Sequence, residues 1–117
     1  MPKRQMPDEL RPGALIPGTL EMLILKAVSR GKTHGYVIAE WIHSVSKEAL
    51  HVEEGALYPA LHRLELRGML DSEWTISETK RRVKVYRLTR EGRKYLTTER
   101  EYWSRLTEGM RRVLESS

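Results

Sequence analysis

Residues 52–68 constrain the fold of this chain more than any other stretch. Leu57, Leu61 and Leu64 recur at steps of four and three residues, so they share one face of a predicted helix. A surface helix that only maintains solubility usually mixes Glu with Lys at four-residue spacing. This helix instead has a smooth and weakly basic surface, which predicts that it enters the DNA major groove as a recognition helix. The residues expected on that surface are Gly55, Ala56, Tyr58, Pro59, His62 and Arg63.

Pro59 and Gly68 indicate where this helix begins and ends. A proline lacks the backbone N–H and is tolerated in the first turn of a helix, where that group has no partner. Pro59 is therefore predicted to lie in the first turn. Gly68 suits the left-handed conformation that commonly ends a helix.

Two shorter helices are predicted before the recognition helix. Thr19 is suited to cap the first and Gly31 to end it, while the second runs from about His34 to Val45. Residues 47–51 then form the turn into the recognition helix. Two helices joined by a turn, the second with a smooth polar surface, form the helix-turn-helix pattern. The residues predicted to point inward are Leu20, Leu23, Ile24, Ala27 and Val28 in the first helix and Ile38, Ile42 and Val45 in the second.

After the recognition helix the pattern becomes alternating, which predicts a β-hairpin. Residues 83–88 are rich in β-branched and aromatic types, and the polar segment 77–82 suits the tip of the hairpin. A hairpin directly after a recognition helix is a wing, whose cations would reach phosphates or the minor groove; the alternative is a hairpin whose charges are only solvated. One face of the first strand would carry Leu70, Ser72, Trp74 and Ile76. The wing cations are Lys80, Arg81, Arg82 and Lys84.

A long amphipathic helix is predicted from Arg90 to Glu115, with Thr89 as its cap. It would be ~39 Å long at ~1.5 Å per residue, which is longer than so small a domain can cover. Its apolar residues recur at heptad spacing. A second copy of the chain is the expected partner, because homodimers are the commonest oligomers. The predicted dimerisation residues are Leu96, Trp103, Leu106, Met110 and Val113.

These elements predict an α+β, mainly helical protein. A winged helix-turn-helix domain at residues 17–89 would be followed by a long C-terminal dimerisation helix at residues 90–117. Residues 1–16 are expected to form a flexible N-terminal arm, because prolines recur there and chain termini are commonly unordered.

The composition excludes several classes of function. A formal charge of +5 and a sequence pI of about 9.7 suit a polyanionic partner, and we expect double-stranded DNA. The absence of cysteine excludes disulfides and suits a reducing cytoplasm. No apolar run is long enough for a membrane span, and no signal-peptide pattern is present. The four histidines lack metal-ligand spacing, and nucleophile-elbow and phosphate-loop motifs are absent. We therefore expect no metal, no cofactor and no enzymatic activity.

Four blocks of sequence occur together in order: Pro17-Gly18-Thr19-Leu20-Glu21; His34-Gly35-Tyr36; Glu54-Gly55-Ala56-Leu57-Tyr58-Pro59-Ala60-Leu61-His62-Arg63-Leu64-Glu65; and Tyr86-Arg87-Leu88-Thr89-Arg90-Glu91-Gly92. Over residues 17 to about 96 they resemble the PadR family of bacterial transcriptional regulators. A single helix after the wing is similar to the short-tailed PadR subgroup. The resemblance implies a winged helix-turn-helix, a homodimer held mainly by the terminal helix, and a palindromic operator, usually bound for repression at the nucleoid in the bacterial cytoplasm.

The DNA-contacting positions of the family carry over by motif to the second helix, the recognition helix and the wing. Ala56 departs from the family, which often has serine or threonine there, and it offers only an apolar contact such as one to a thymine methyl group. The operator preference of the family therefore does not transfer. The positions implied by the resemblance are Tyr36, Gly55, Ala56, Tyr58, Pro59 and His62, together with the wing cations.

Most of these residues also have a purely structural interpretation. Tyr36 and Tyr58 are alternatively packing aromatics, and Arg63 is alternatively the partner of Glu65 or another surface acid. Trp103 either packs the dimer interface or, beside its copy near the two-fold axis, holds a small flat aromatic effector between two indoles. Some short-tailed PadR members sense aromatic drugs at that level. The rival function is a winged helix that binds another protein without binding DNA, which an acidic or apolar recognition surface would favour.

Overall fold

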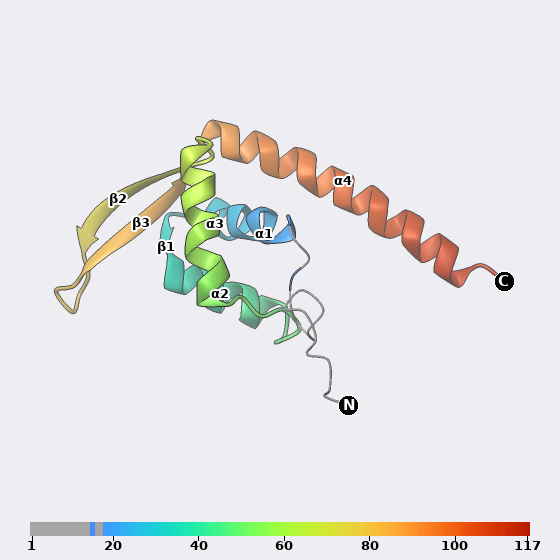
Figure 1. Ribbon diagram of the computed structural model, residues 1–117, viewed down its shortest axis with the longest axis horizontal. Helices are drawn as coiled ribbons and strands as arrows, with labels where there is room; N and C mark the ends of the chain where they lie inside the picture. Colours follow the sequence, from blue (N-terminus) through green and yellow to red (C-terminus); the bar gives the residue numbers. More distant parts are fainter. Residues whose placement is uncertain (1–14, 16–17) are drawn as a thin grey trace, which may run out of the picture.

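The computed structural model describes residue 15 and residues 18–117, so the predicted arm lies outside the described residues apart from Leu15. Three helices lie together, the β2–β3 hairpin extends to one side of them, and α4 extends to the other (Figure 1). This architecture confirms the predicted α+β, mainly helical winged helix. The elements in chain order are α1 (Thr19–Ser29), β1 (Thr33–His34), α2 (Gly35–Val45), α3 (Glu54–Leu66), β2 (Leu70–Ile76), β3 (Arg82–Leu88) and α4 (Arg90–Glu115).

The core lies where α1, α2 and α3 meet. Ile24 of α1 and Ile38 of α2 are fully buried. On α3, Leu57 is 2% exposed, and Leu61 and Leu64 are fully buried. The amphipathic spacing that predicts the recognition helix is therefore confirmed.

The last turn of α2 departs from the predicted pattern. The spacing predicts that Val45 points inward, but its side chain is 59% exposed, so this prediction is wrong. Val45 ends the helix, and the chain then turns away through Lys47 and Glu48, whose φ angles of 53° and 66° are both positive. Beyond this turn Leu50 packs against the core, and Val52 is the next apolar side chain that is buried in it.

One of the two predicted threonine caps is present. The prediction for Thr19 is wrong, because Gly18 is the N-cap of α1 and Thr19 is already its first helical residue. Gly18 has a φ of 92°, which glycine adopts readily, so the chain enters the helix one residue early. The cap at Thr89 is confirmed, since its Oγ1 accepts a hydrogen bond from the Gly92 N–H at 3.0 Å.

Pro59 lies deeper in α3 than the sequence predicts. The first helical hydrogen bonds run from Ala56 and Leu57 to the Glu53 carbonyl, at 3.0 and 2.9 Å. Pro59 is therefore in the second turn, and its predicted place in the first turn is wrong. The ring removes the one hydrogen bond that would reach the Gly55 carbonyl, on the exposed side of the helix where water can replace it.

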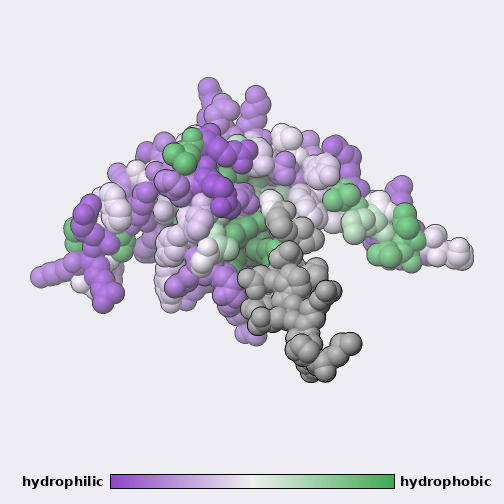
Figure 2. Space-filling model, in the orientation of Figure 1, coloured by the Kyte–Doolittle hydropathy of each residue, from purple (hydrophilic) through white to green (hydrophobic). Residues whose placement is uncertain are grey.

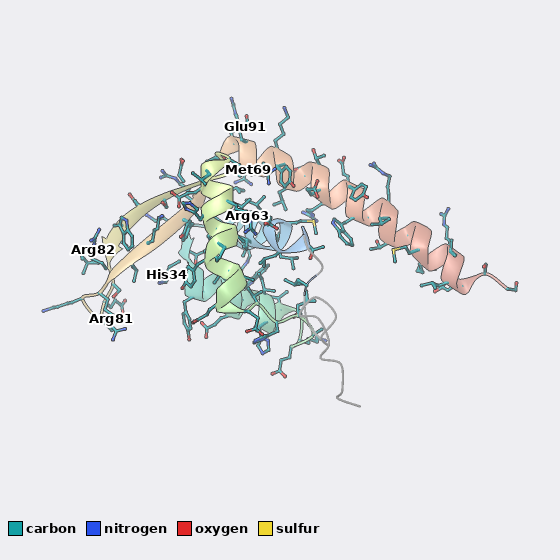
Figure 3. The ribbon with its side chains drawn as sticks, in the orientation of Figure 1. His34, Arg63, Met69, Arg81, Arg82 and Glu91 are labelled. Atoms are coloured by element: carbon teal, nitrogen blue, oxygen red, sulfur yellow. The ribbon has the colours of Figure 1, made fainter. Side chains whose placement is uncertain are left out.

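Gly68 ends α3 as predicted, with a φ of 76°. Its N–H bonds to the Glu65 carbonyl at 3.0 Å, and the N–H of Met69 bonds to the Leu64 carbonyl at 2.9 Å, which is a Schellman motif. The same turn is joined to α4, because the Thr89 hydroxyl donates to the Gly68 carbonyl at 2.7 Å. The end of the recognition helix is thus attached directly to the start of the terminal helix, near the labelled Met69 in Figure 3.

The hairpin forms the predicted wing. β2 and β3 pair antiparallel, β1 pairs with the other edge of β3, and the sheet order is β1-β3-β2. Burial decreases along β2: Leu70 is 1% exposed, whereas Trp74 and Ile76 are 57% and 62% exposed. The distal half of the wing therefore projects beyond the core (Figure 1).

Helix α4 has a packed and an unpacked part. Leu96 is buried in the core of its own protomer, so the prediction that it lies on an uncovered stripe is wrong. It is placed there because the first turns of α4 pack against α1, and the stripe becomes exposed only farther along. Leu106 is 37% exposed, Met110 53% and Val113 72%. No helix in the described part of the chain, α4 included, is long and apolar enough to cross a membrane.

Candidate nucleic-acid interface

The outer surface of α3 is open along its length. The first turn combines a glycine with an alanine, and a Cβ added at Gly55 would meet no atom within 4 Å. Another molecule can therefore approach the backbone closely there. The helix lies in front of α1 and α2 and beside the wing, so both elements can face one duplex (Figure 1). The six residues predicted on this surface are all exposed: Gly55, Ala56, Tyr58, Pro59, His62 and Arg63.

Tyr58 is positioned by a glycine on the neighbouring helix. A Cβ added at Gly35, the first residue of α2, would lie 3.0 Å from Cε1 of Tyr58 and 3.2 Å from Cδ1 of Leu61. The absence of a side chain at Gly35 therefore allows the tyrosine ring to lie on the start of α2. Tyr58 remains 49% exposed, so packing on α2 still leaves about half of the residue accessible to another molecule.

Tyr36 is 66% exposed at the start of α2. Its hydroxyl donates to Oε1 of Glu40, one turn later, at 3.0 Å. This hydrogen bond, together with the charge of the Glu40 carboxylate, raises the pKa of Tyr36. The hydroxyl therefore stays protonated and can donate to an incoming phosphate only by leaving Glu40.

Arg63 is paired with an acid of α1. Its Nη2 and Nε lie 2.6 and 3.1 Å from the same oxygen of Glu21. The sequence leaves Arg63 open between a DNA contact and a surface ion pair, and the structure places the guanidinium in an ion pair. Figure 3 shows Arg63 on the part of α3 that crosses α1. The cation therefore attaches the recognition helix to the scaffold, while the neighbouring His62 stays exposed.

Lys84 on β3, opposite Trp74 of β2, is likewise paired. Its Nζ lies 2.9 Å from Oε1 of Glu65 on α3, and the hydroxyl of Ser72 donates to Oε2 of the same carboxylate at 2.8 Å. Burial raises the pKa of Glu65, but the hydrogen bonds from Lys84 and Ser72 outweigh it and the pKa is lowered. The hydrogen bond to Glu65 raises the pKa of Lys84. This charged cluster fixes the wing to the recognition helix.

The three remaining wing cations lie beyond this cluster. Arg81 and Arg82 lie at the far end of the hairpin (Figure 3). The tip is held by hydrogen bonds from Ser77 to the Arg81 carbonyl at 2.8 Å and from Lys80 to the Ser77 carbonyl at 2.9 Å. Within residues 18–117, no acidic side chain pairs with Lys80, Arg81 or Arg82. The tip therefore presents three cations without an acidic partner in the described part of the chain, next to the single acid Glu78.

The histidines do not form a metal site. His43 and His51 face each other edge to face, with ring centroids 5.8 Å apart. Nδ1 of His34 and Nδ1 of His43 are buried and lack a hydrogen-bond partner among the described atoms. In the part of the chain that the structure describes, no three His, Asp or Glu side chains are close enough to hold a metal ion.

Comparison with known proteins assigns the fold to a family. The model of the PadR-like family of transcriptional regulators matches residues 24–98, which include α2, α3 and the wing. This chain belongs to the PadR-like family. It is 38% identical over 77 residues to the transcriptional regulator Rv3488 of Mycobacterium tuberculosis, covering 66% of this chain and 68% of that protein.

Solved structures of PadR-like and related regulators share the fold. A transcriptional regulator from Clostridium thermocellum is 33% identical, with a TM-score of 0.74 over 81% of this chain and 92% of that one. A PadR family regulator from Eggerthella lenta is 35% identical, with a TM-score of 0.72 over 86% and 85%. PadR-like proteins are DNA-binding transcriptional regulators, so the assignment supports the expectation that this chain is not an enzyme.

Sequence reasoning missed the residues that position this PadR-like surface. Glu21 and Glu65 hold two of the predicted DNA-binding cations, and Ser72 completes one of those clusters. The spacing of residues along the chain does not reveal such ion pairs, because the two partners lie far apart in the sequence or on different elements. Gly35 was detectable, since it stands inside the His34-Gly35-Tyr36 block.

Proposed function

We propose that this PadR-like protein is a repressor that binds a palindromic operator as a homodimer. In this proposal Tyr58 and His62 contact bases, while Gly55, Ala56 and Pro59 allow α3 to enter the major groove closely. Phosphates are contacted by Tyr36, Lys80, Arg81 and Arg82. Arg63 and Lys84 act by holding α3 and the wing in place, because both are already paired with acids.

The observation that carries the proposal is the uncovered apolar stripe on the second half of α4. Leu106, Met110, Val113 and the neighbouring Leu114 are 37–80% exposed on their own protomer. Figure 2 shows this hydrophobic surface along the far half of α4. So large an exposed apolar area on one helix favours an interface, and a two-fold partner would cover it with the same stripe. Two recognition helices would then face two half-sites, which supports a palindromic operator.

A footprint of the purified protein on the DNA upstream of its own coding region tests the proposal. We expect protection of a two-fold symmetric site and less transcription from the adjacent promoter when the protein is added. Protection without symmetry would contradict the dimer, and activation would contradict the repressor role.

The interface itself is tested by placing a charge in the stripe. Met110→Glu should give a folded monomer in sedimentation, because Met110 is 53% exposed on its own protomer. Ser104→Glu is the matched control, since Ser104 is exposed and lies about 120° around the helix from Met110. Deleting residues 97–117 should also yield a monomer. A truncated or Met110→Glu protein that stays dimeric would exclude this interface.

We extend the proposal to a small aromatic effector held between the two copies of Trp103. Trp103 is half-buried in one protomer, beside the exposed Tyr102 and Leu106. A planar aromatic compound should quench tryptophan emission at micromolar concentration and weaken DNA binding. The comparison protein is Trp103→Leu, because Trp41 and Trp74 contribute background. Equal quenching in both proteins would leave Trp103 as an interface residue only.

A further inference from the structure

Trp74 on β2 is an exposed aromatic side chain that the proposed function does not use. Its indole is 57% exposed, and Ile76, two residues farther out on the same face, is 62% exposed. Aromatic side chains usually bury most of their area, so a large one left open at the end of a wing indicates a contact surface. Figure 2 shows hydrophobic surface among the hydrophilic residues at this end of the hairpin.

The strand register fixes the direction in which Trp74 faces. Ser72, two residues earlier on the same face, hydrogen-bonds Glu65 of α3. Lys84, directly opposite Trp74 in the register, forms an ion pair with the same carboxylate. Trp74 therefore lies on the face of the wing that turns toward the recognition helix. Along β2 it is two residues beyond Ser72, and α3 leaves its indole 57% exposed.

The two faces of the wing differ in charge. The face that carries Trp74 also carries Arg82 and Lys84 on β3, and the acid of α3 next to it is neutralised by Lys84. The opposite face carries Asp71 and Glu73 on β2 and Arg87 on β3, whose Nη2 lies 3.9 Å from Oδ2 of Asp71. A phosphate backbone is attracted to the first face, where Arg82 has no acidic partner within residues 18–117, whereas Glu73 leaves the second face with an excess of negative charge. Charge complementarity thus favours DNA as the occupant of the Trp74 face, which is continuous with the proposed DNA surface of α3.

Trp74 also orders a cation. The guanidinium carbon of Arg82 lies 4.6 Å from the centroid of the Trp74 ring, and Nζ of Lys84 lies 6.0 Å from it. A guanidinium stacked on an indole keeps its N–H groups available in a fixed fork, so its binding to a phosphate costs less conformational entropy. We propose that Trp74 is a DNA-binding residue: its ring packs against the sugar–phosphate backbone between wing and recognition helix, and it positions Arg82 toward the groove. The inference rests on the proposed function, because it requires the wing to lie on DNA.

The chain provides a matched control for this residue. Trp41 is also stacked with an arginine, since the guanidinium carbon of Arg30 lies 4.6 Å from its ring centroid, but it lies on α2 and packs against the core. Trp74→Leu should raise the Kd for a mixed-sequence duplex about 5- to 30-fold for a dimer with two wings on DNA, and Trp74→Phe should recover part of this affinity. Trp41→Leu should leave the Kd unchanged. Circular dichroism and thermal unfolding verify that each variant is folded.

A second measurement observes the indole directly. In the Trp41→Phe/Trp103→Phe protein, Trp74 is the one remaining tryptophan, and the duplex should change its emission. The double variant Trp74→Leu/Arg82→Gln should lose less DNA-binding free energy than the sum of the losses of the two single variants, because the residues act as a pair. Unchanged emission with equal affinities of Trp74→Leu and the unmodified chain would overturn the inference while leaving the proposed function intact. A chain that binds no duplex at low salt would overturn both.

Discussion

The recognition helix and the wing expose opposite kinds of surface, although both are expected to contact one duplex. On α3 the exposed arginine of the recognition surface, Arg63, is neutralised by Glu21, and the rest of that surface is small, aromatic or imidazole. At the wing tip Lys80, Arg81 and Arg82 have no acidic partner within residues 18–117. From this difference we expect the wing to attract phosphates and α3 to discriminate between bases.

Removing the wing charges should have the largest effect. Lys80→Ala, Arg81→Ala and Arg82→Ala combined should weaken binding to operator and unrelated duplex by the same factor. The slope of log Kd against log salt should flatten by about 0.9 for each phosphate that the variant no longer neutralises, up to about 5 for two wings. Fluorescence anisotropy between about 50 and 200 mM salt measures both quantities. An unchanged salt slope would remove the wing from the interface.

Changes on the recognition helix should have smaller and base-specific effects. Tyr58→Phe keeps the ring on Gly35 and removes only the hydroxyl, while His62→Ala removes an exposed side chain. Each should relax the preference at particular base pairs by about 1–3 kcal/mol where the contact is a good one. The salt slope should not change. Binding to a panel of single-base operator variants measures the base preference. Uniform weakening across the panel would mean that both residues contact the DNA backbone and not the bases.

Substitutions at two glycines distinguish a role in packing from a role in the close approach of α3 to DNA. Gly35→Ala should lower the free energy of unfolding by about 1 kcal/mol, because the new methyl group meets Tyr58. Gly55→Ala meets nothing within 4 Å, so it should raise stability by up to about 1 kcal/mol through helix propensity. It should nevertheless weaken DNA binding if α3 approaches the groove closely at that residue. Urea unfolding and duplex titration give the two values; tighter DNA binding by Gly55→Ala would contradict the close approach.

The cluster around Glu65 should give the smallest effect. Because the folded pKa of Glu65 is lowered, its stabilising contribution is fully present above the unfolded pKa of about 4.3 and is lost as the pH falls through the folded value. Glu65→Gln should therefore cost about 0.5–1 kcal/mol near neutral pH, and the difference should disappear in acid. Thermal unfolding across this pH range measures the difference in stability between the two proteins. A difference that does not change with pH would mean that the carboxylate charge is not responsible.

Local patterns predicted the elements well because each depends on neighbours in sequence. The leucine spacing of α3, the left-handed Gly68, the Thr89 cap and the span of α4 were all predictable. The errors at Val45 and Leu96 have one cause: periodicity assigns a face to a side chain but does not say where the neighbouring element stops covering that face.

The candidate site was predicted less completely than the fold. Residue type and spacing predicted which side chains of α3 and the wing tip are exposed, since both depend on local order. They did not reveal that Arg63 and Lys84 are paired with Glu21 and Glu65, because those contacts arise only when separate elements pack together. The stacking of Arg82 on Trp74 was hidden for the same reason.

Selection from a random DNA pool tests the central claim most directly, with the full chain and the wing triple variant used side by side. If α3 carries the preference and α4 pairs two protomers, both proteins should enrich the same inverted repeat. Its half-sites should lie about 34–36 Å apart, one helical turn of DNA. The variant should require lower salt to do so. No enrichment, an asymmetric site, or a different motif for the variant would contradict the account.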